Sequence, residues 1–202
     1  MKKILPWLAF AGCIFILIRS QFSIPNIWEA DGYLHARMAD MLWTDGIVKK
    51  FPWARYSLFN DRFADKDILY HALLIPFIKI GSIFYGAKVA ACFFAVLLLV
   101  VYWWILRQVC KDWRLQILFT VLFLISGHFL SALNRPRTMV PAIALMLVGI
   151  QFILQKRRWP LAIITFLYGL MHITALLMLA SDGTIQGIHL VPAVPGLNYL
   201  AR

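Results

Sequence analysis

The sequence has very few acidic residues: nine Asp or Glu among 202 residues, against 20 Lys or Arg. Charged residues make up only 14% of the chain, whereas hydrophobic residues make up 62%. A soluble domain of this length buries only part of its surface, so it cannot hide this much apolar area. Because several apolar runs also reach the length that crosses a bilayer, the composition predicts an all-α integral membrane protein.

Cysteines are equally scarce, and their positions argue against both a disulfide framework and a cysteine metal site. Cys13 and Cys92 lie inside apolar runs and Cys110 lies at the end of one, so no two of them share an aqueous segment. The sequence also lacks internal repeats of solenoid length and low-complexity tracts. We therefore expect one transmembrane domain over residues 1–180, followed at 181–202 by an irregular tail or a truncation point.

The net charge of +11 does not predict nucleic-acid binding, because the basic residues form small clusters at the ends of the apolar runs. Five of these runs are predicted to cross the membrane: residues 4–18, 87–106, 115–133, 138–154 and 160–180. The first run follows a basic start and has no small-x-small cleavage site after it, so we interpret it as an uncleaved signal anchor.

The short segments that join the runs carry Lys and Arg unevenly. Eight of these residues fall on one side of the membrane, whereas the opposite short loop holds only Arg135 and Arg137. The positive-inside rule then places the amino terminus in the cytoplasm and residues 19–86 in a long outer loop. In a bacterial inner membrane, where we expect this protein, the outer loop would be periplasmic.

The outer loop holds seven of the nine acidic residues, all between residues 29 and 67. On a helix, residues four apart lie nearly above one another, so Asp31 and His35 would share an apolar stripe with Met38. A carboxylate that points inward needs a partner, and His35, a cation or a sugar hydroxyl could supply it. The alternative is that Asp31 only caps a helix that begins near Gly32.

The same Asp-x-x-x-His spacing recurs in the outer loop as Asp67 and His71, in "DILYH". Two such pairs could form a four-ligand metal site or a carboxylate–imidazole acid/base pair. The alternative is two capped amphipathic helices on the membrane surface. Arg37 and Asp40 are predicted to form a simple surface ion pair, and Asp65 is interpreted as a turn former.

Two further groups of polar residues accompany the later spans. Arg135 and Arg137, in the outer loop "LNRPRTMVP", stand at the mouth of a helix, where they could clamp a phosphate or anchor lipid headgroups. His172 is expected in the middle of the last span, where a bond to a neighbouring helix is favoured over a direct role.

Taken together, the order of these parts resembles the amino-terminal portion of GT-C-type membrane glycosyltransferases, over about residues 1–180. The resemblance rests on a short first span, an outer loop that opens with "DGYLHAR", a helix that ends in "LLIPF", and closely spaced later spans. Asp31 stands at the position of that family's first-loop aspartate. The stretch "FADKDILYHALLIPF" also looks similar to a group of bacterial membrane proteins that we associate with the same superfamily.

The resemblance implies transfer of a sugar from a polyprenyl-phosphate-linked donor to an acceptor at the outer membrane face. The residues that it implies are Asp31 and His35 for catalysis, and Asp67, His71, Arg135 and Arg137 for substrate binding. Two departures are visible, since "NRPRTM" lacks the second acidic motif of some members and the chain stops after five predicted spans. The first departure slightly favours a metal-independent mechanism, with a divalent cation as the alternative.

The competing hypothesis is a non-catalytic membrane subunit or assembly factor whose outer loop docks a partner. The short chain and the missing acidic motif favour it. A transporter is less favoured, because no charged residue lies deep in a predicted span. The expected partners are a lipid-linked sugar donor, membrane lipids and, under the second hypothesis, partner membrane subunits, but no nucleic acid.

Overall fold

The computed structural model describes residues 4–51, 54–172 and 174–175, and within these ranges the chain is helical, without strands. The helices are α1 (Leu5–Gln21), α2 (Ala30–Thr44), the short 3₁₀ helix η1 (Leu58–Asn60), α3 (Ile68–Ile78), α4 (Ile83–Val109), α5 (Trp113–Ile125), α6 (Gly127–Leu133), α7 (Met139–Leu154) and α8 (Arg158–Gly169). The predicted all-α class is confirmed for this part of the chain.

Helix α4 is the structural centre of the molecule. It has 27 residues and is the one helix of the described ranges that is long and apolar enough to cross a membrane by itself. Four other helices, α1, α3, α5 and α7, are apolar but shorter. The five predicted spans are therefore supported in part, with one full-length candidate and several shorter apolar helices.

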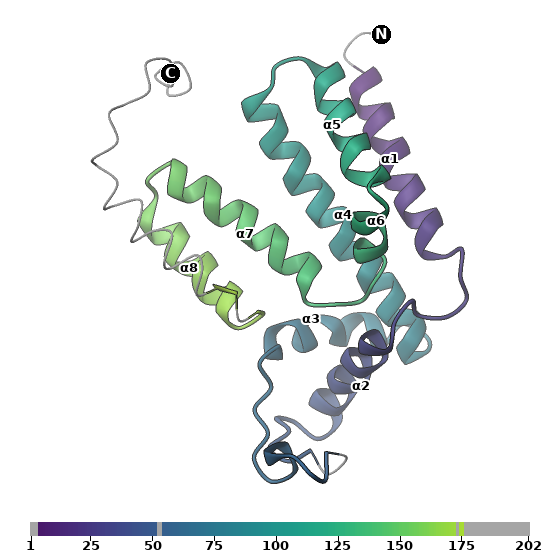
Figure 1. The fold of residues 1–202 in the computed structure, drawn as a ribbon, viewed down its shortest axis with the longest axis vertical. Helices are drawn as coiled ribbons and strands as arrows, with labels where there is room; N and C mark the ends of the chain where they lie inside the picture. The colour runs from purple at the N-terminus through teal and green to yellow at the C-terminus, as the bar shows by residue number, and fades with distance from the viewer. Residues whose placement is uncertain (1–3, 52–53, 173, 176–202) are drawn as a thin grey trace.

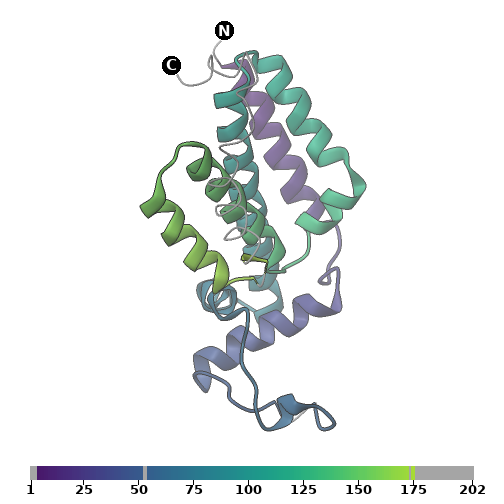
Figure 2. The same cartoon turned by 60° about the vertical axis from the view of Figure 1, so that its left-hand side comes forward.

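The helices pack around α4 in three groups. Helices α1 and α5 contact each other and α4 on one side, while α7 contacts both α4 and α8 on the other. Helices α2 and α3 contact each other and α4, and they lie across the end of the bundle that is remote from the amino terminus (Figures 1 and 2). The acidic segment predicted as an outer loop is thus gathered at one end of the bundle.

The corner between α3 and α4 is a close backbone contact that fixes this arrangement. A Cβ atom built on Gly86 would lie 2.2 Å from the carbonyl oxygen of Phe77. Only glycine permits this approach, because any side chain at that position would overlap the backbone of α3. Leu74 of α3 and Leu98 and Leu99 of α4 are fully buried in the core of the bundle.

Two span predictions need correction. The predicted span 115–133 is two helices, since α5 ends at Ile125 and α6 begins at Gly127. The residue between them, Ser126, has φ −60° and ψ 105°, which is not helical, and a Ser-Gly pair is a frequent cause of such breaks. The predicted span 160–180 is also shorter, because α8 ends at Gly169; residues 176–180 and the predicted tail 181–202 lie outside the described residues.

Candidate functional site

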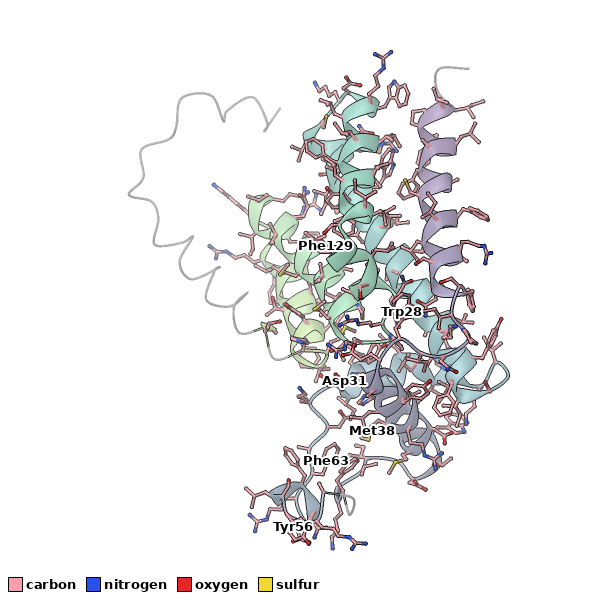
Figure 3. The ribbon with its side chains drawn as sticks, turned by 45° about the vertical axis from the view of Figure 1, so that its right-hand side comes forward. Trp28, Asp31, Met38, Tyr56, Phe63 and Phe129 are labelled. Carbon is pink, nitrogen blue, oxygen red and sulfur yellow. The ribbon has the colours of Figure 1, made fainter. Side chains whose placement is uncertain are left out.

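Helix α2 carries the first group of polar residues, at the end that faces the bundle. Its N-cap is Glu29, in an extended conformation, and its first residue is Ala30. The alternative in which Asp31 only caps a helix that begins near Gly32 is therefore wrong, because Asp31 lies within the first turn. There its carboxylate lies near the N-terminal end of α2. Figure 3 shows Asp31 at the junction of α2 with the bundle, whereas Tyr56 and Phe63 lie in the far loop.

The turn between α6 and α7 brings two arginines to these carboxylates. Nη2 of Arg137 donates to Oδ2 of Asp31 at 2.7 Å and also contacts Oε1 of Glu29. Nη1 of Arg135 lies 3.3 Å from Oε2 of Glu29, and its Nη2 donates to Ser131 at 3.0 Å. The structure thus joins residues more than 100 positions apart into one cluster of two carboxylates and two guanidinium groups.

Glu29 is the member of this cluster that sequence reasoning missed as a site residue. It is the single glutamate in the sequence and stands two residues before Asp31, which was a usable signal. Its carboxylate receives contacts from both arginines, so it neutralises them jointly. The predicted phosphate clamp is therefore already occupied by carboxylates, and a phosphate would have to share or displace these contacts.

The prediction that Asp31 points inward along an apolar stripe is wrong, because its side chain is 55% exposed. The buried face of α2 consists instead of Gly32, Ala36, Met38 and Ala39. Small residues form this face because α2 lies very close to its neighbours. A charged carboxylate stays near water and an arginine rather than entering that contact.

Gly32 is the point where α2 meets the arginine-bearing turn. A Cβ atom on Gly32 would lie 2.6 Å from Cγ of Pro136 and 2.6 Å from Cγ2 of Ile27. Pro136 stands between the two arginines in sequence, so the absence of a side chain at Gly32 lets both guanidinium groups reach α2. The geometry of the charged cluster therefore depends on this glycine.

A second polar group links α2 to α3 through two histidines. Nδ1 of His71 lies 2.6 Å from Oδ2 of Asp65, and Nε2 of His71 lies 2.8 Å from Nδ1 of His35. The side chains of His71 and Asp65 are almost fully buried, with 4% and 9% exposed. His35 thus pairs with His71, and the predicted pairing with Asp31 is not formed.

Asp65 was interpreted as a turn former, and this interpretation missed its role. Its Oδ1 accepts the backbone N–H of Asp67 at 3.0 Å, which is the expected turn contact, while its Oδ2 holds His71. Asp67 is instead the N-cap residue that immediately precedes α3, and it is buried. The four-ligand arrangement of Asp31, His35, Asp67 and His71 is not formed, and no group of three or more potential metal ligands occurs among the described residues.

The carboxylate of Asp65 constrains which ring nitrogens of His71 and His35 donate a hydrogen bond and which accept one. Ionised Asp65 only accepts, so Nδ1 of His71 carries a proton; when His71 is neutral, its Nε2 accepts from Nδ1 of His35. Nε2 of His35 is then left as a proton acceptor at the end of an Asp65–His71–His35 chain. This tautomer assignment follows from the hydrogen-bond network.

Burial and neighbouring charges shift the pKa values of His35 and Asp65 in this hydrogen-bond chain. Burial, followed by the neighbouring His71, lowers the pKa of His35 to about 4, so its imidazole is neutral at pH 7. Burial acts to raise the pKa of Asp65, but the hydrogen bond and charge of His71 outweigh it and leave that pKa below its ordinary value. The result is an ionised carboxylate at one end and a neutral, proton-accepting imidazole at the other.

Asp67 and His172 lie near the Asp65–His71–His35 hydrogen-bond chain. Burial raises the pKa of Asp67, and nearby positive groups, including His172, partly oppose that rise. His172 was predicted in the middle of a span, but it follows the end of α8, where its Nδ1 lies 2.8 Å from Oγ1 of Thr174. The chain turns back after Gly169, so His172 lies at the same end of the bundle as α3.

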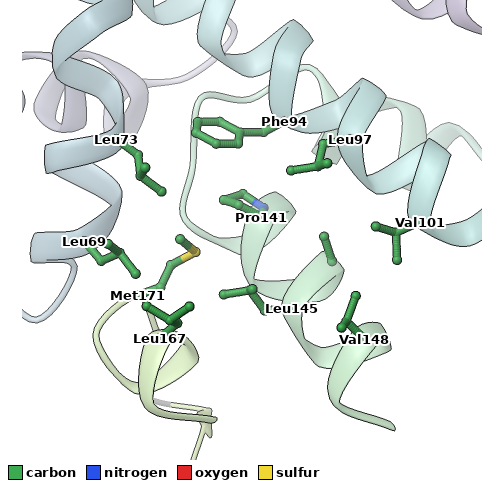
Figure 4. A pocket seen from close by; sticks show the side chains of 11 residues that line it. Leu69, Leu73, Phe94, Leu97, Val101, Pro141, Leu145, Val148, Leu167 and Met171 are labelled. Carbon is green, nitrogen blue, oxygen red and sulfur yellow. The ribbon is translucent and has the colours of Figure 1, made fainter. Parts of the chain in front are cut away.

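An apolar pocket of about 340 Å³ lies between α3, α4, α7 and the end of α8 (Figure 4). Its walls come from α3, α4, α7 and the end of α8, and they include Leu69, Leu73, Phe94, Pro141, Leu145 and Met171. Leu69 and Leu73 flank His71 in sequence, Met171 precedes His172, and Pro141 follows Arg137 by one helical turn. The pocket and the two polar groups are therefore built partly from the same or adjoining segments of the chain.

Sequence reasoning could not have found the pocket. Its residues come from four helices that are separated along the chain, and each is an ordinary apolar residue in an apolar helix. The sequence carries no local pattern for such a cavity, because the space depends on how the helices cross.

The fold and site are those of a helical protein with one long apolar helix and a charged, histidine-containing cluster at one end of its bundle. Residues 49–185, more than half of the chain, match the EpsG family, and the chain belongs to that family. Membership indicates a membrane protein with a glycosyltransferase-related, polymerase-like function. No curated protein and no solved structure matches the chain significantly.

The region matched to the family contains only some of the site residues. It contains Asp65, Asp67, His71 and both arginines of the α6–α7 turn, whereas Glu29, Asp31 and His35 precede it. The resemblance to GT-C-type enzymes is not tested by the family match and stays a prediction.

Proposed function

We propose that this protein is a membrane glycosyltransferase that moves a sugar from a polyprenyl-phosphate-linked donor to an acceptor at the outer membrane face. The observation that carries the proposal is that the apolar pocket is lined by α3 and α7, and that His71 lies on α3 and Arg137 just before α7. A lipid-linked donor needs an apolar site for its chain directly beside a polar site for its phosphate and sugar. Family membership supports the same class of function.

The proposed placement is a bacterial inner membrane, with the amino terminus in the cytoplasm. The structure supports a common orientation, because α2, α3 and the arginine-bearing turn meet at one end of the bundle. The basic residues Arg107, Lys111 and Arg114 lie around the opposite end of α4, where the positive-inside rule expects the cytoplasm. Residues 22–82 then lie outside, with α3 at the interface.

In this arrangement the first part of the polyprenyl chain occupies the pocket between α3, α4 and α7. The phosphate then emerges near the start of α7, where Arg137 precedes the pocket residue Pro141 by four positions. Glu29 and Asp31 hold Arg135 and Arg137 in place before the donor arrives, and the phosphate takes over part of their contacts. Two guanidinium groups stabilise the negative charge that grows on the leaving phosphate.

We assign the role of general base to His35 in place of Asp31, because Asp31 is paired with Arg137. The acceptor hydroxyl oxygen attacks the anomeric carbon and forms the new glycosidic bond, while the bond from that carbon to the donor phosphate breaks. The phosphate leaves with the electron pair, and Nε2 of His35 takes the hydroxyl proton. Asp65 and His71 fix the tautomer of His35 and stabilise the imidazolium that forms.

The test is a transfer assay with the purified full-length chain in liposomes that contain a polyprenyl-diphosphate-linked oligosaccharide. Arg137→Gln is expected to reduce transfer by about 100-fold or more, since it removes charge stabilisation of the leaving group. Arg37→Gln is the matched control, because Arg37 forms an exposed ion pair with Asp40 on the same helix as Asp31. Equal rates in the two variants would remove the arginine-bearing turn from the mechanism, and no transfer by the wild-type chain would favour the non-catalytic subunit.

A further inference from the structure

Lys88, in the second turn of α4, is a buried cation outside the site described above. Only 4% of the residue is exposed. Its Nζ donates to the carbonyl oxygens of Ile24 and, at 3.3 Å, of Pro25, and lies 5.3 Å from the ring centre of Phe22. Both hydrogen-bond partners are acceptors only, so the nitrogen is the donor in each contact.

No carboxylate of the described residues forms an ion pair with Lys88. Two carbonyl dipoles solvate an ammonium group but do not neutralise it, and a buried charge without a counter-ion is costly. The positive end of α4, a helix of 27 residues, adds to the positive potential at this point. The region is therefore suited to a bound anion.

A cavity of about 650 Å³ opens beside Lys88. Its walls are the segment that joins α1 to α2, the side chain of Tyr33 and the first two turns of α4. Four aromatic rings line it, those of Phe22, Tyr33, Phe84 and Tyr85, and the last two are about half exposed. A ligand that fits these walls has an anionic group for Lys88 and an apolar or ring-shaped part for the aromatic residues.

The cavity lining contains none of Glu29, Asp31, Arg135 and Arg137, the residues of the charged cluster. Tyr33 and Asp31 are two residues apart on α2, so their side chains point about 200° apart around the helix axis. An anion in this cavity would therefore not contact Arg135 or Arg137, and the cavity is a separate site.

The position of Lys88 along α4 indicates which anion this is. Five residues separate Lys88 from Ile83, the first residue of α4, which corresponds to about 7.5 Å along the helix axis. The headgroup layer on each side of a bilayer is about 5 to 8 Å thick, and aromatic side chains concentrate there. With α4 across the membrane, Lys88 and the exposed rings of Phe84 and Tyr85 lie at the level of lipid phosphates.

We propose that this cavity binds the phosphodiester headgroup of an anionic membrane lipid, with Lys88 as the cation that contacts the phosphate. The inference rests on the proposed membrane placement, but not on the proposed sugar transfer. A bound lipid would hold the segment that Lys88 already tethers, and this segment leads directly to Glu29. The lipid therefore acts on the arginine cluster only by ordering the chain before α2.

The experiment measures binding of phosphatidylglycerol, and of zwitterionic phosphatidylcholine, to the detergent-purified full chain by native mass spectrometry. Lys88→Met is expected to lower the affinity for phosphatidylglycerol about tenfold or more, as for the loss of one charge-assisted hydrogen bond. Lys88→Arg keeps the charge and is expected to retain most of the affinity. Lys79→Met is the matched control, since Lys79 is a partly exposed lysine that pairs with Asp40.

A second variant keeps the test decisive if Lys88→Met fails to fold. Tyr85→Glu places a carboxylate in the cavity wall and leaves Lys88 itself unchanged. Ser82 caps α4 and its side chain accepts from the backbone N–H of Tyr85, so a glutamate at that position completes a capping box and favours the helix. This variant is expected to fold like the wild type and to lose affinity for phosphatidylglycerol by repulsion of the phosphate.

Equal phosphatidylglycerol binding by Lys79→Met and the two cavity variants would overturn the proposal. Saturation of the cavity by inorganic phosphate without lipid, or preferential binding of polyprenyl phosphate there, would also overturn the assignment to a membrane lipid. Lipid binding that depends on Lys88 in a chain without sugar transfer would support this inference while the proposed function fails. Sugar transfer by a chain whose lipid binding does not depend on Lys88 would support the proposed function and overturn this inference.

Discussion

His35 on α2 and His71 on α3 face each other through ring nitrogens 2.8 Å apart. Because Asp65 holds the other nitrogen of His71 at 2.6 Å, the contact has a direction, from a carboxylate through one imidazole to the next. A serine hydrolase uses a carboxylate and one imidazole to the same end, with the carboxylate fixing the tautomer of the base. Here a second imidazole extends the chain to a residue that precedes the region matched to the family.

The first prediction concerns Asp65. Asp65→Asn removes the charge that fixes the tautomer of His71 and stabilises an imidazolium, so sugar transfer is expected to fall about 100-fold or more. Asp61→Asn is the control, because Asp61 is exposed in the same segment and its side chain accepts from the neighbouring Asn60. Transfer rates are measured together with circular dichroism of both variants. Retained transfer in a folded Asp65→Asn chain would leave the histidine pair with a structural role only.

The second prediction is the pH dependence of stability. The folded state keeps the pKa of His35 near 4, below its ordinary value of 6.5, so the unfolded chain binds more protons between these values. Stability from His35 is therefore fully present above about pH 6.5 and is lost as the pH falls towards 4. Thermal unfolding of wild type and His35→Gln between pH 4 and 7 measures this contribution as a difference. The raised pKa of Asp67 makes its contribution to stability change with pH in the opposite direction. Because Asp67 is present in both wild type and His35→Gln, the difference between them isolates the contribution of His35. Parallel curves for the two would contradict the burial of neutral His35.

Parts of this fold follow directly from local sequence. The apolar runs predicted at 4–18, 87–106 and 138–154 appear as α1, α4 and α7, because run length and composition decide such helices without reference to the rest of the chain. The surface pair of Arg37 and Asp40 is also confirmed, at 2.8 Å, since a spacing of three on one helix face is enough to predict it.

The site was harder to predict because its contacts join distant segments. Asp31 meets Arg137 across 106 positions, and nothing near either residue encodes the partner. The spacing of Asp67 and His71 predicted a pair, but Asp67 stands before the helix and lacks the helical geometry that this spacing assumes. His71 instead takes Asp65, which the loop places at its Nδ1, so the wrong member of "ADKD" was chosen.

The third prediction tests the close approach at Gly32. Gly32→Ala places a Cβ atom 2.6 Å from Cγ of Pro136, and the overlap is expected to destabilise the fold by about 1–3 kcal/mol and to separate the arginines from α2. Gly12→Ala in α1 is the matched control, because nothing lies within 4 Å of a Cβ there. In α1 the same substitution should be neutral or stabilising by up to about 1 kcal/mol. Unfolding curves compare the two, and equal stability would show that α2 does not rest on the arginine-bearing turn.

The fourth prediction concerns the apolar pocket as the site of the donor lipid chain. Leu97 lines the pocket and is partly exposed, so Leu97→Trp fills the space without forcing a fully buried position to expand. The KM for a donor with a long polyprenyl chain is expected to rise about tenfold, the equivalent of roughly two buried methylene groups. A donor with a short lipid chain uses less of the pocket and should be affected less. Phe93→Trp, at another exposed position of α4 outside the pocket lining, is the control and should leave both KM values unchanged. If Leu97→Trp and Phe93→Trp give the same KM for the long donor, the polyprenyl chain binds outside this pocket.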